Sequence, residues 1–174
     1  ISVTDSNAIN SSYIYDAYTK VASLDTLAIS PSITISELFG GAAPTALTNV
    51  ETLDTHNTII AGFLANCVYV QNVTINGTIR EIGDNAFLNC TALIKVTFDN
   101  SKKENLTTIG ANAFNGAISL ATFEVNGGES DGKELPNSVT TIGQGAFDGT
   151  KWLSVNSSDM VIVGNGILYR YRGS

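Results

Sequence analysis

Apolar and polar residues alternate with a period of two in three short segments, at residues 73–75, 96–98 and 123–125. This alternation is typical of a strand with one buried face, and the β-branched and aromatic residues in these segments are common in strands. The side chains predicted to point inward are Val73, Ile75, Val96, Phe98, Phe123 and Val125. Those predicted to face solvent are Asn72, Thr74, Lys95, Thr97, Thr122 and Glu124.

A second pattern recurs along the chain. It reads I-G-x-x-A-F, five further residues and a leucine, and it occurs at residues 82–93, 109–120 and 142–153. A degenerate copy lies at residues 59–70, and a weaker one begins at Ser36. Polar insertions at residues 100–105 and 126–133 lengthen the spacing between later copies, and their composition predicts loops.

These copies predict stacked turns of chain. One turn buries too little apolar surface to offset the ordering of its own backbone, whereas stacked turns share a continuous core. We therefore expect Phe87, Phe114 and Phe147 to line up from turn to turn. The predicted core is Leu64, Val73, Ile75, Phe87, Leu93, Val96, Phe98, Phe114, Leu120, Phe123 and Phe147.

The two ends of the array need covers. At the N-terminal end, residues 12–24 have the spacing of an amphipathic helix, with one apolar face. That helix is predicted to cover the first turn, although the neighbouring tyrosines also suit a sugar-stacking patch. Trp152 is expected to pack across the last turn, because a large aromatic side chain is usually buried. The apolar face and the tyrosines are Ile14, Ala17, Val21, Leu24, Tyr13, Tyr15 and Tyr18.

The string at residues 82–98, I-G-x-x-A-F-x-x-C-x-x-L-x-x-V-x-F, resembles the BspA-like (treponemal-type) leucine-rich repeat. Residues 35–50 look like the opening repeat of such arrays, and residues 161–169 look like the family's connecting hairpin, which usually leads into further repeats. The resemblance implies an α/β solenoid: a short right-handed superhelix with a parallel concave sheet and short helical or irregular convex segments. The expected organisation is an N-terminal cap over residues 1–32, four to five turns over residues 33–170, and a tail at 171–174.

The resemblance also bears on function. Members of the family are mostly secreted or attached to cell walls, they are associated with adhesion to proteins or glycans, and they share no catalytic residues. The resemblance therefore implies an extracellular or cell-surface location and a partner that is a protein or a glycan. This chain departs from the clean pattern in its few leucines and its variable repeat length.

Charge narrows the range of partners. The net charge is -7 and the pI is about 4.5. Binding to nucleic acid requires a basic surface, and docking on anionic lipid has the same requirement, so both are disfavoured. The longest apolar run, at residues 59–65, is far shorter than the roughly 18 residues that cross a bilayer, which argues against membrane insertion.

Candidate chemistry is sparse. Cys67 and Cys90 occupy equivalent repeat positions, and they are predicted either as small buried side chains or as a disulfide between adjacent turns. Two cysteines and the single, distant His56 are too few for a four-ligand zinc site, so no metal and no cofactor are expected. His56 lies in a polar stretch without a nucleophile motif, and it is predicted to be an exposed loop residue.

The carboxylates give no clearer sign of an enzyme. Glu51, Asp54, Asp99 and Glu124 lie at or near predicted strands, and a glycosidase needs two such groups about 5–9 Å apart. At most one acid falls on each outward strand face, so scattered solvated charge is the better interpretation and no catalytic residue is assigned.

The sequence therefore predicts a non-enzymatic binding or adhesion module. The outward residues Asn72, Thr74, Lys95, Thr97, Thr122 and Glu124 are the predicted contacts with a protein or glycan. The alternative is a structural spacer that projects another domain from a cell surface. A hydrolase joined to repeats is a third class, and no motif in the sequence favours it.

Overall fold

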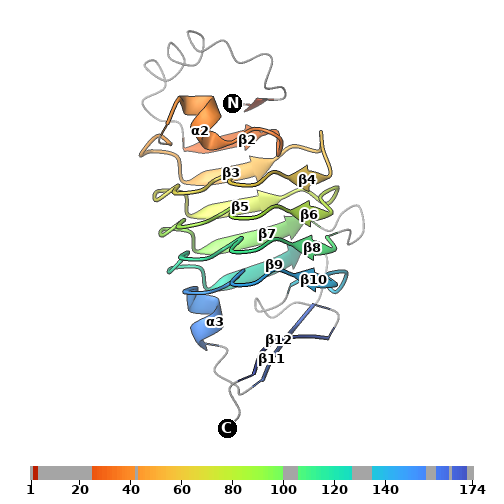
Figure 1. Cartoon of the computed structure of the whole chain (residues 1–174). Helices are drawn as coiled ribbons and strands as arrows, with labels where there is room; N and C mark the ends of the chain where they lie inside the picture. The colour runs from red at the N-terminus through yellow and green to blue at the C-terminus, as the bar shows by residue number, and fades with distance from the viewer. Residues whose placement is uncertain are drawn as a thin grey trace.

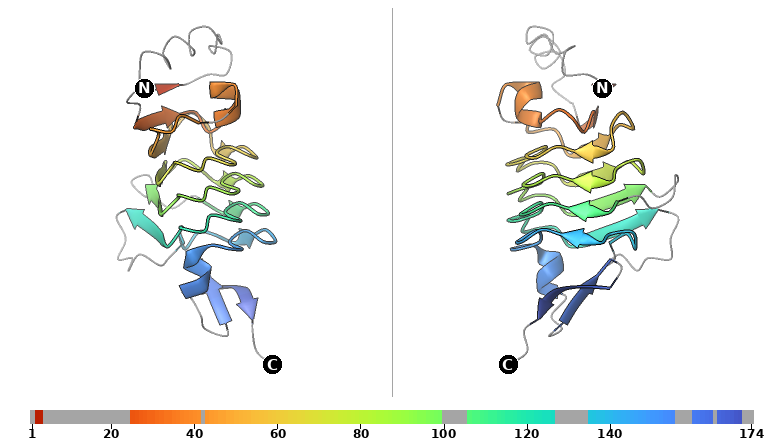
Figure 2. Two further views of the ribbon diagram at one scale, coloured as in Figure 1. Left: turned by 90° about the vertical axis from the view of Figure 1, so that its left-hand side faces the viewer. Right: turned by 45° about the vertical axis from the view of Figure 1, so that its right-hand side comes forward.

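The computed structural model describes residues 2–3, 25–41, 43–99, 106–126, 135–155, 160–164 and 166–171. The helix expected at residues 12–24, its tyrosines, most of both polar insertions and the end of the tail lie outside the described residues. In the described part of the chain, successive turns stack on one another in the order of the sequence (Figures 1 and 2).

The larger sheet has six strands, and every neighbouring pair is parallel. This confirms the strands expected around residues 73–75, 96–98 and 123–125. The sheet already includes β2, which precedes residue 33, the expected start of the repeats. In spatial order the strands are β1 (Ser2–Val3), β2 (Thr26–Ile29), β3 (Asn49–Thr52), β5 (Asn72–Ile75), β7 (Lys95–Asp99) and β9 (Thr122–Asn126).

A second parallel sheet runs along the other side of the turns. Its strands are β4 (Thr58–Ile59), β6 (Glu81–Ile82), β8 (Thr108–Ile109) and β10 (Thr141–Ile142). A six-residue turn follows each of these strands, at residues 61–66, 84–89, 111–116 and 144–149. The sequence predicted short helical or irregular segments here. The structure has the irregular ones, because each turn contains residues with positive φ, such as Asn85 and Asn112, which end a helix.

The I-G pair of each repeat allows adjacent turns to lie close together. The N–H of Gly83 donates to the carbonyl of Ile59 (2.8 Å), and Gly110 donates to Ile82 in the same way (2.7 Å). A Cβ atom on Gly110 would lie 2.6 Å from the backbone nitrogen of Asp84. Only glycine fits this position without moving the preceding turn.

The core is one continuous stack, as predicted. All eleven predicted core residues are buried, and none has more than 5% of its surface exposed. The Phe87 and Phe114 rings are parallel, with centroids 4.9 Å apart, and Phe114 and Phe147 repeat the arrangement at 5.6 Å. Phe63 meets Phe87 edge-on at 6.1 Å and extends the stack toward the N-terminal end. Val125, also expected to point inward, is only partly buried.

Short helices close the two ends. The weak repeat copy that begins at Ser36 forms α2 (Ile35–Phe39), which a capping box between Thr34 and Glu37 stabilises. At the other end, α3 (Lys151–Val155) places Trp152 against the Phe147 ring, with centroids 4.9 Å apart, and this confirms the expected cover. The antiparallel strands β11 (Met160–Val163) and β12 (Ile167–Tyr171) confirm the expected hairpin.

Candidate functional site

Two rows of side chains cross the solvent face of the six-stranded sheet. Strand register places Asn49, Asn72, Lys95 and Thr122 side by side in the first row. The second row contains Glu51, Thr74, Thr97 and Glu124. The structure thus brings all six predicted contact residues together on β5, β7 and β9. Asn49 and Glu51 extend both rows onto β3. The sequence could have predicted them, because they precede Asn72 and Thr74 by the 23-residue repeat spacing.

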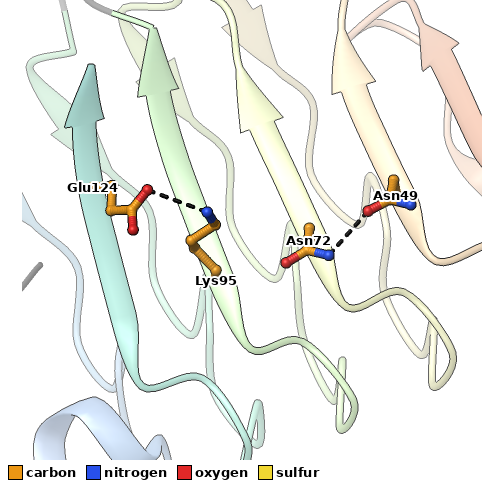
Figure 3. A network of polar contacts seen from close by, with 4 residues as sticks. All are labelled: Asn49, Asn72, Lys95 and Glu124. Atoms are coloured by element: carbon orange, nitrogen blue, oxygen red, sulfur yellow. Dashed lines mark hydrogen bonds and ion pairs between the residues drawn. The ribbon is translucent and has the colours of Figure 1, made fainter. Parts of the chain in front are cut away.

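Polar side chains on this face are linked in pairs, within the first row and between the two rows (Figure 3). The Asn72 side-chain amide donates to Oδ1 of Asn49 (2.9 Å), and the Asn49 amide donates to the Thr48 hydroxyl (3.0 Å). Lys95 Nζ forms an ion pair with Glu124 Oε2 (3.2 Å), and about two fifths of each side chain is exposed. Exposed pairs of this kind contribute only about 0.2–1 kcal/mol, so a partner's groups can replace them at small cost.

Thr97 corrects one expectation. It was expected to face solvent, but only 8% of its surface is exposed. The strand β7 has a neighbour on each side, which places Thr97 between Thr74 and Glu124. Lys95, two residues earlier on the same face, forms its ion pair with Glu124 beside Thr97. A short threonine side chain is covered by these longer neighbours, and it offers little area to a ligand.

An apolar corner, which the sequence analysis missed, borders the polar rows. It consists of the exposed residues Val68, Tyr69, Ile94 and Ile118, which are 44%, 44%, 47% and 59% exposed. They lie in the segments that lead into β5, β7 and β9, on three successive turns. Ile94 immediately precedes Lys95 of the first row, so the corner adjoins the rows at the start of β7. Their exposure could have been predicted from the sequence, because these apolar residues fall outside the repeated core positions.

His56 is exposed, as predicted. Its Nδ1 lies 3.0 Å from the Thr55 hydroxyl and 3.3 Å from the Ser30 hydroxyl. Ser30 is completely buried, and its hydroxyl also contacts Ser32 and Thr55. A buried hydroxyl cannot reach a substrate carbonyl, so Ser30 and His56 do not have the geometry of a nucleophile and its base.

Glu51 and Glu124, the two carboxylates of the second row, are too far apart for paired acid and base catalysis. Glu51 and Glu124 lie in the same row, but β5 and β7 separate their strands. Three strand spacings amount to roughly 14 Å, whereas glycosidase carboxyls are about 5–9.5 Å apart. Across the described ranges, no group of three or more His, Cys, Asp or Glu residues could hold a metal ion.

Both cysteines are buried free thiols. The thiol of Cys90 donates to the carbonyl of Leu64 (3.0 Å). Burial raises the pKa of Cys67 to about 12, and it also raises the pKa of Cys90. Neutral buried thiols are poor nucleophiles. The expectation of small buried side chains is confirmed, and the alternative of a disulfide is wrong.

Comparison with known proteins agrees with the repeat architecture. A family model described as "BspA type Leucine rich repeat region (6 copies)" matches residues 12–131 and 131–170. A solved leucine-rich repeat protein from Bacteroides ovatus is 19% identical, with a TM-score of 0.51 over 76% of this chain and 33% of that one. This likeness supports the fold. No curated protein matches the chain.

Two further solved structures are similar over part of the chain. A leucine-rich repeat protein of T. pallidum is 22% identical over 57% of this chain, with a TM-score of 0.37. A leucine-rich cell surface protein of Faecalibacterium prausnitzii is 25% identical over 72% of this chain, with a TM-score of 0.36. The chain spans 33% to 53% of the length of the three proteins. In the described part of the chain, no helix is both long and apolar enough to cross a membrane.

Proposed function

Because the chain belongs to the BspA-type leucine-rich repeat family, we propose that it is a non-enzymatic binding module whose ligand is a protein. The proposed contact surface is the solvent face of the six-stranded sheet together with the apolar corner beside it. The contact residues are Asn49, Asn72, Lys95, Thr122 and Glu124 from the rows and Val68, Tyr69, Ile94 and Ile118 from the corner.

The apolar corner is the observation that carries this proposal. Four of the six large apolar side chains that are exposed within the described residues lie in this corner, and the other two, Val155 and Ile162, lie near the C-terminal end. Large exposed apolar side chains gathered beside polar residues are typical of protein interfaces. Clustered aliphatic side chains such as Ile94 and Ile118 favour a protein partner over a glycan. The strands also present the polar residues of the rows with little loss of conformational entropy on binding.

The proposed location is outside the cell or on its surface. The family supports it, and one similar solved structure is described as a cell surface protein. Secretion and exposure on the cell would bring the sheet face into contact with partner proteins. Surface labelling of intact cells that express the full-length protein, followed by detection of the labelled repeats, tests the location.

A binding screen with face variants tests the proposed function. The purified chain is applied to arrays of extracellular and cell-surface proteins and to glycan arrays. Any ligand is then measured against Ile94→Asp with Ile118→Asp, and against Lys95→Ala with Glu124→Ala. Glu81→Ala, an exposed residue on β6 of the other sheet, is the matched control. We expect at least a tenfold loss of affinity in both face variants and none in the control. Unchanged binding by the face variants, or ligands on the glycan array alone, would contradict the proposal.

A spacer that projects another domain is the second candidate function. The hairpin β11–β12 supports it, because it follows the last described repeat and extends from the end of the array (Figure 1). A spacer tolerates changes on the sheet face as long as the stack stays folded. In the full-length protein, the face variants would then leave ligand binding intact, whereas deletion of the repeats would weaken it.

A further inference from the structure

A ladder of backbone hydrogen bonds runs along the array where the strands of the larger sheet begin. The N–H of Thr48 donates to the carbonyl of Asp25 (3.0 Å), and the N–H of Gln71 donates to the carbonyl of Thr48 (2.8 Å). The N–H of Ile94 donates to the carbonyl of Gln71 (2.8 Å), and the N–H of Ala121 donates to the carbonyl of Ile94 (3.1 Å). The ladder follows the strand order β2, β3, β5, β7 and β9 (Figure 1). Asp25 therefore lies on one line with Ile94 of the apolar corner, three turns away.

Charge is distributed unevenly along this line. Asp25 and Glu51, near its N-terminal end, are exposed, and neither carboxylate has an ion pair among the residues that the structure describes. The segments that carry the apolar corner contain no charged residue, and Lys95, which follows Ile94, is paired with Glu124. The surface thus has an apolar part and a separate part with negative charge.

Strand spacing sets the distance between these two parts. Neighbouring strands are about 4.8 Å apart, so three steps of the ladder place Asp25 roughly 14 Å from Ile94. Glu51 lies two strands from Ile94 and three residues further along its strand, which also gives a separation of roughly 14 Å. A partner that contacts both parts must therefore extend across several strands.

A basic protein complements this surface better than a second copy of the chain. The chain has a net charge of -7, so two copies repel each other. Exposed Lys151 lies two turns beyond Ile94, on the other side of the corner. It is more than roughly 20 Å from Asp25, well beyond the screening length of about 8 Å in physiological salt. Lys151 therefore does not neutralise the charge at the N-terminal end of the ladder.

We propose that the protein partner of the sheet face is basic and lies along the axis of the array, across β3, β5 and β7. Its apolar side chains pack on the corner, and its lysine or arginine side chains lie about 14 Å away, beside Asp25 and Glu51. Complementary charge at this end fixes the direction of the partner and selects against acidic proteins. This inference rests on the proposed function, because it names the chemistry of the partner that the same surface binds.

A displayed library tests the chemistry that the surface selects. The probe is a yeast-displayed library of three-helix miniproteins in which one helix face is randomised. Clones that bind the intact chain are sorted again for loss of binding to the variant Ile94→Asp with Ile118→Asp. We expect these corner-dependent clones to carry lysine or arginine about nine or ten residues from their apolar anchors. A helix rises about 1.5 Å per residue, so this separation covers about 14 Å.

Two glutamates provide a matched pair for the charge test. Glu51 and Glu81 are both exposed strand residues, they lie on different sheets, and a change to lysine at either position alters the net charge equally. Glu51→Lys is expected to weaken the corner-dependent clones at least fivefold, whereas Glu81→Lys changes their affinity less than twofold. Raising the salt concentration from about 50 to about 500 mM narrows this difference, because salt screens exposed charges. Thermal unfolding confirms that both variants fold.

The proposal is overturned if the corner-dependent clones have no excess of lysine and arginine over the starting library, or if no clone depends on the corner. Equal effects of Glu51→Lys and Glu81→Lys would also overturn it. Sedimentation of the chain alone is a further check, since a dimer that Ile94→Asp with Ile118→Asp dissociates would make a second copy the occupant.

Failure of this inference is distinguishable from failure of the proposed function. An extracellular protein ligand from the arrays that requires the corner but binds Glu51→Lys unchanged would retain the proposed function and overturn the inference. The proposed function itself fails when no protein ligand on the arrays depends on the sheet face, whatever the miniproteins show.

Discussion

The rings of Phe87 and Phe114 are stacked, with an interplanar angle of 2° and centroids 4.9 Å apart. They belong to equivalent positions of adjacent turns, so this contact joins one repeat to the next. Phe114 also meets Phe147 and Phe123, and it is completely buried. The Phe114→Ala change is expected to cost about 3–5 kcal/mol of unfolding free energy, because it leaves a cavity in the middle of the stack. Urea unfolding measures this loss.

Ile118→Ala is the control for that change. Ile118 lies four residues after Phe114 in the same repeat but is 59% exposed. Its truncation is expected to change the free energy of unfolding by no more than about 0.5 kcal/mol. Equal losses in the two variants would contradict the packing described for Phe114.

Two glycine positions of the repeat are predicted to differ in how well they tolerate substitution. Gly110→Ala places a Cβ against the backbone of the preceding turn and is expected to destabilise the chain by about 1–3 kcal/mol. Gly62 has a φ of 69° with open space around it, and the equivalent residue one turn later is Asn85, with a φ of 57°. Gly62→Asn is therefore expected to be nearly neutral. Thermal melting compares the two, and a Gly110→Ala variant as stable as the unmodified chain would exclude the close approach.

The Lys95–Glu124 ion pair is predicted to contribute little to stability. Both side chains are about two fifths exposed, so water screens the attraction. A double-mutant cycle with Lys95→Ala and Glu124→Ala is expected to give a coupling free energy below about 1 kcal/mol, and lower still in high salt. A large, salt-insensitive coupling would mean that these charges hold the sheet together instead of being available to a partner.

The buried thiols predict a loss of stability at alkaline pH. Burial raises the pKa of Cys67 from its ordinary value of 9.0 to about 12, so the unfolded chain loses this proton at lower pH than the folded chain. Stability from this group is complete below pH 9 and falls as the pH rises toward 12. The thiols should also resist Ellman's reagent at pH 8 until the chain unfolds. Cys67→Ala with Cys90→Ala should flatten the alkaline decline, and rapid thiol labelling of the folded chain would contradict their burial.

The sequence predicted the main sheet and the core because strands of four or five residues display the two-residue alternation clearly. The sequence did not predict the second sheet, because its strands contain only two residues each and cannot show a two-residue alternation. The turns that follow those strands depend on left-handed backbone at Asn85 and Asn112, which no hydrophobic pattern reveals.

The candidate surface was predictable only in part. Alternation placed Lys95 and Glu124 on the solvent face, but it could not report that neighbouring side chains cover Thr97. It also says nothing about Ile94 and Ile118, whose exposure depends on where successive turns bend. The hydrogen bond from Phe147 to the Tyr169 hydroxyl joins residues 22 positions apart, and no repeat spacing relates them.

Unfolding of a variant at one end, followed by fluorescence at the other, tests the continuous stack most directly. Trp152 is the single tryptophan and packs on Phe147 at the C-terminal end, whereas Phe63 lies at the opposite end of the aromatic stack. If the turns share one core, Phe63→Ala lowers the urea midpoint of Trp152 fluorescence and of far-ultraviolet circular dichroism by the same amount. A Trp152 transition that keeps its original midpoint, while circular dichroism shows an earlier loss of structure, would contradict a single stack.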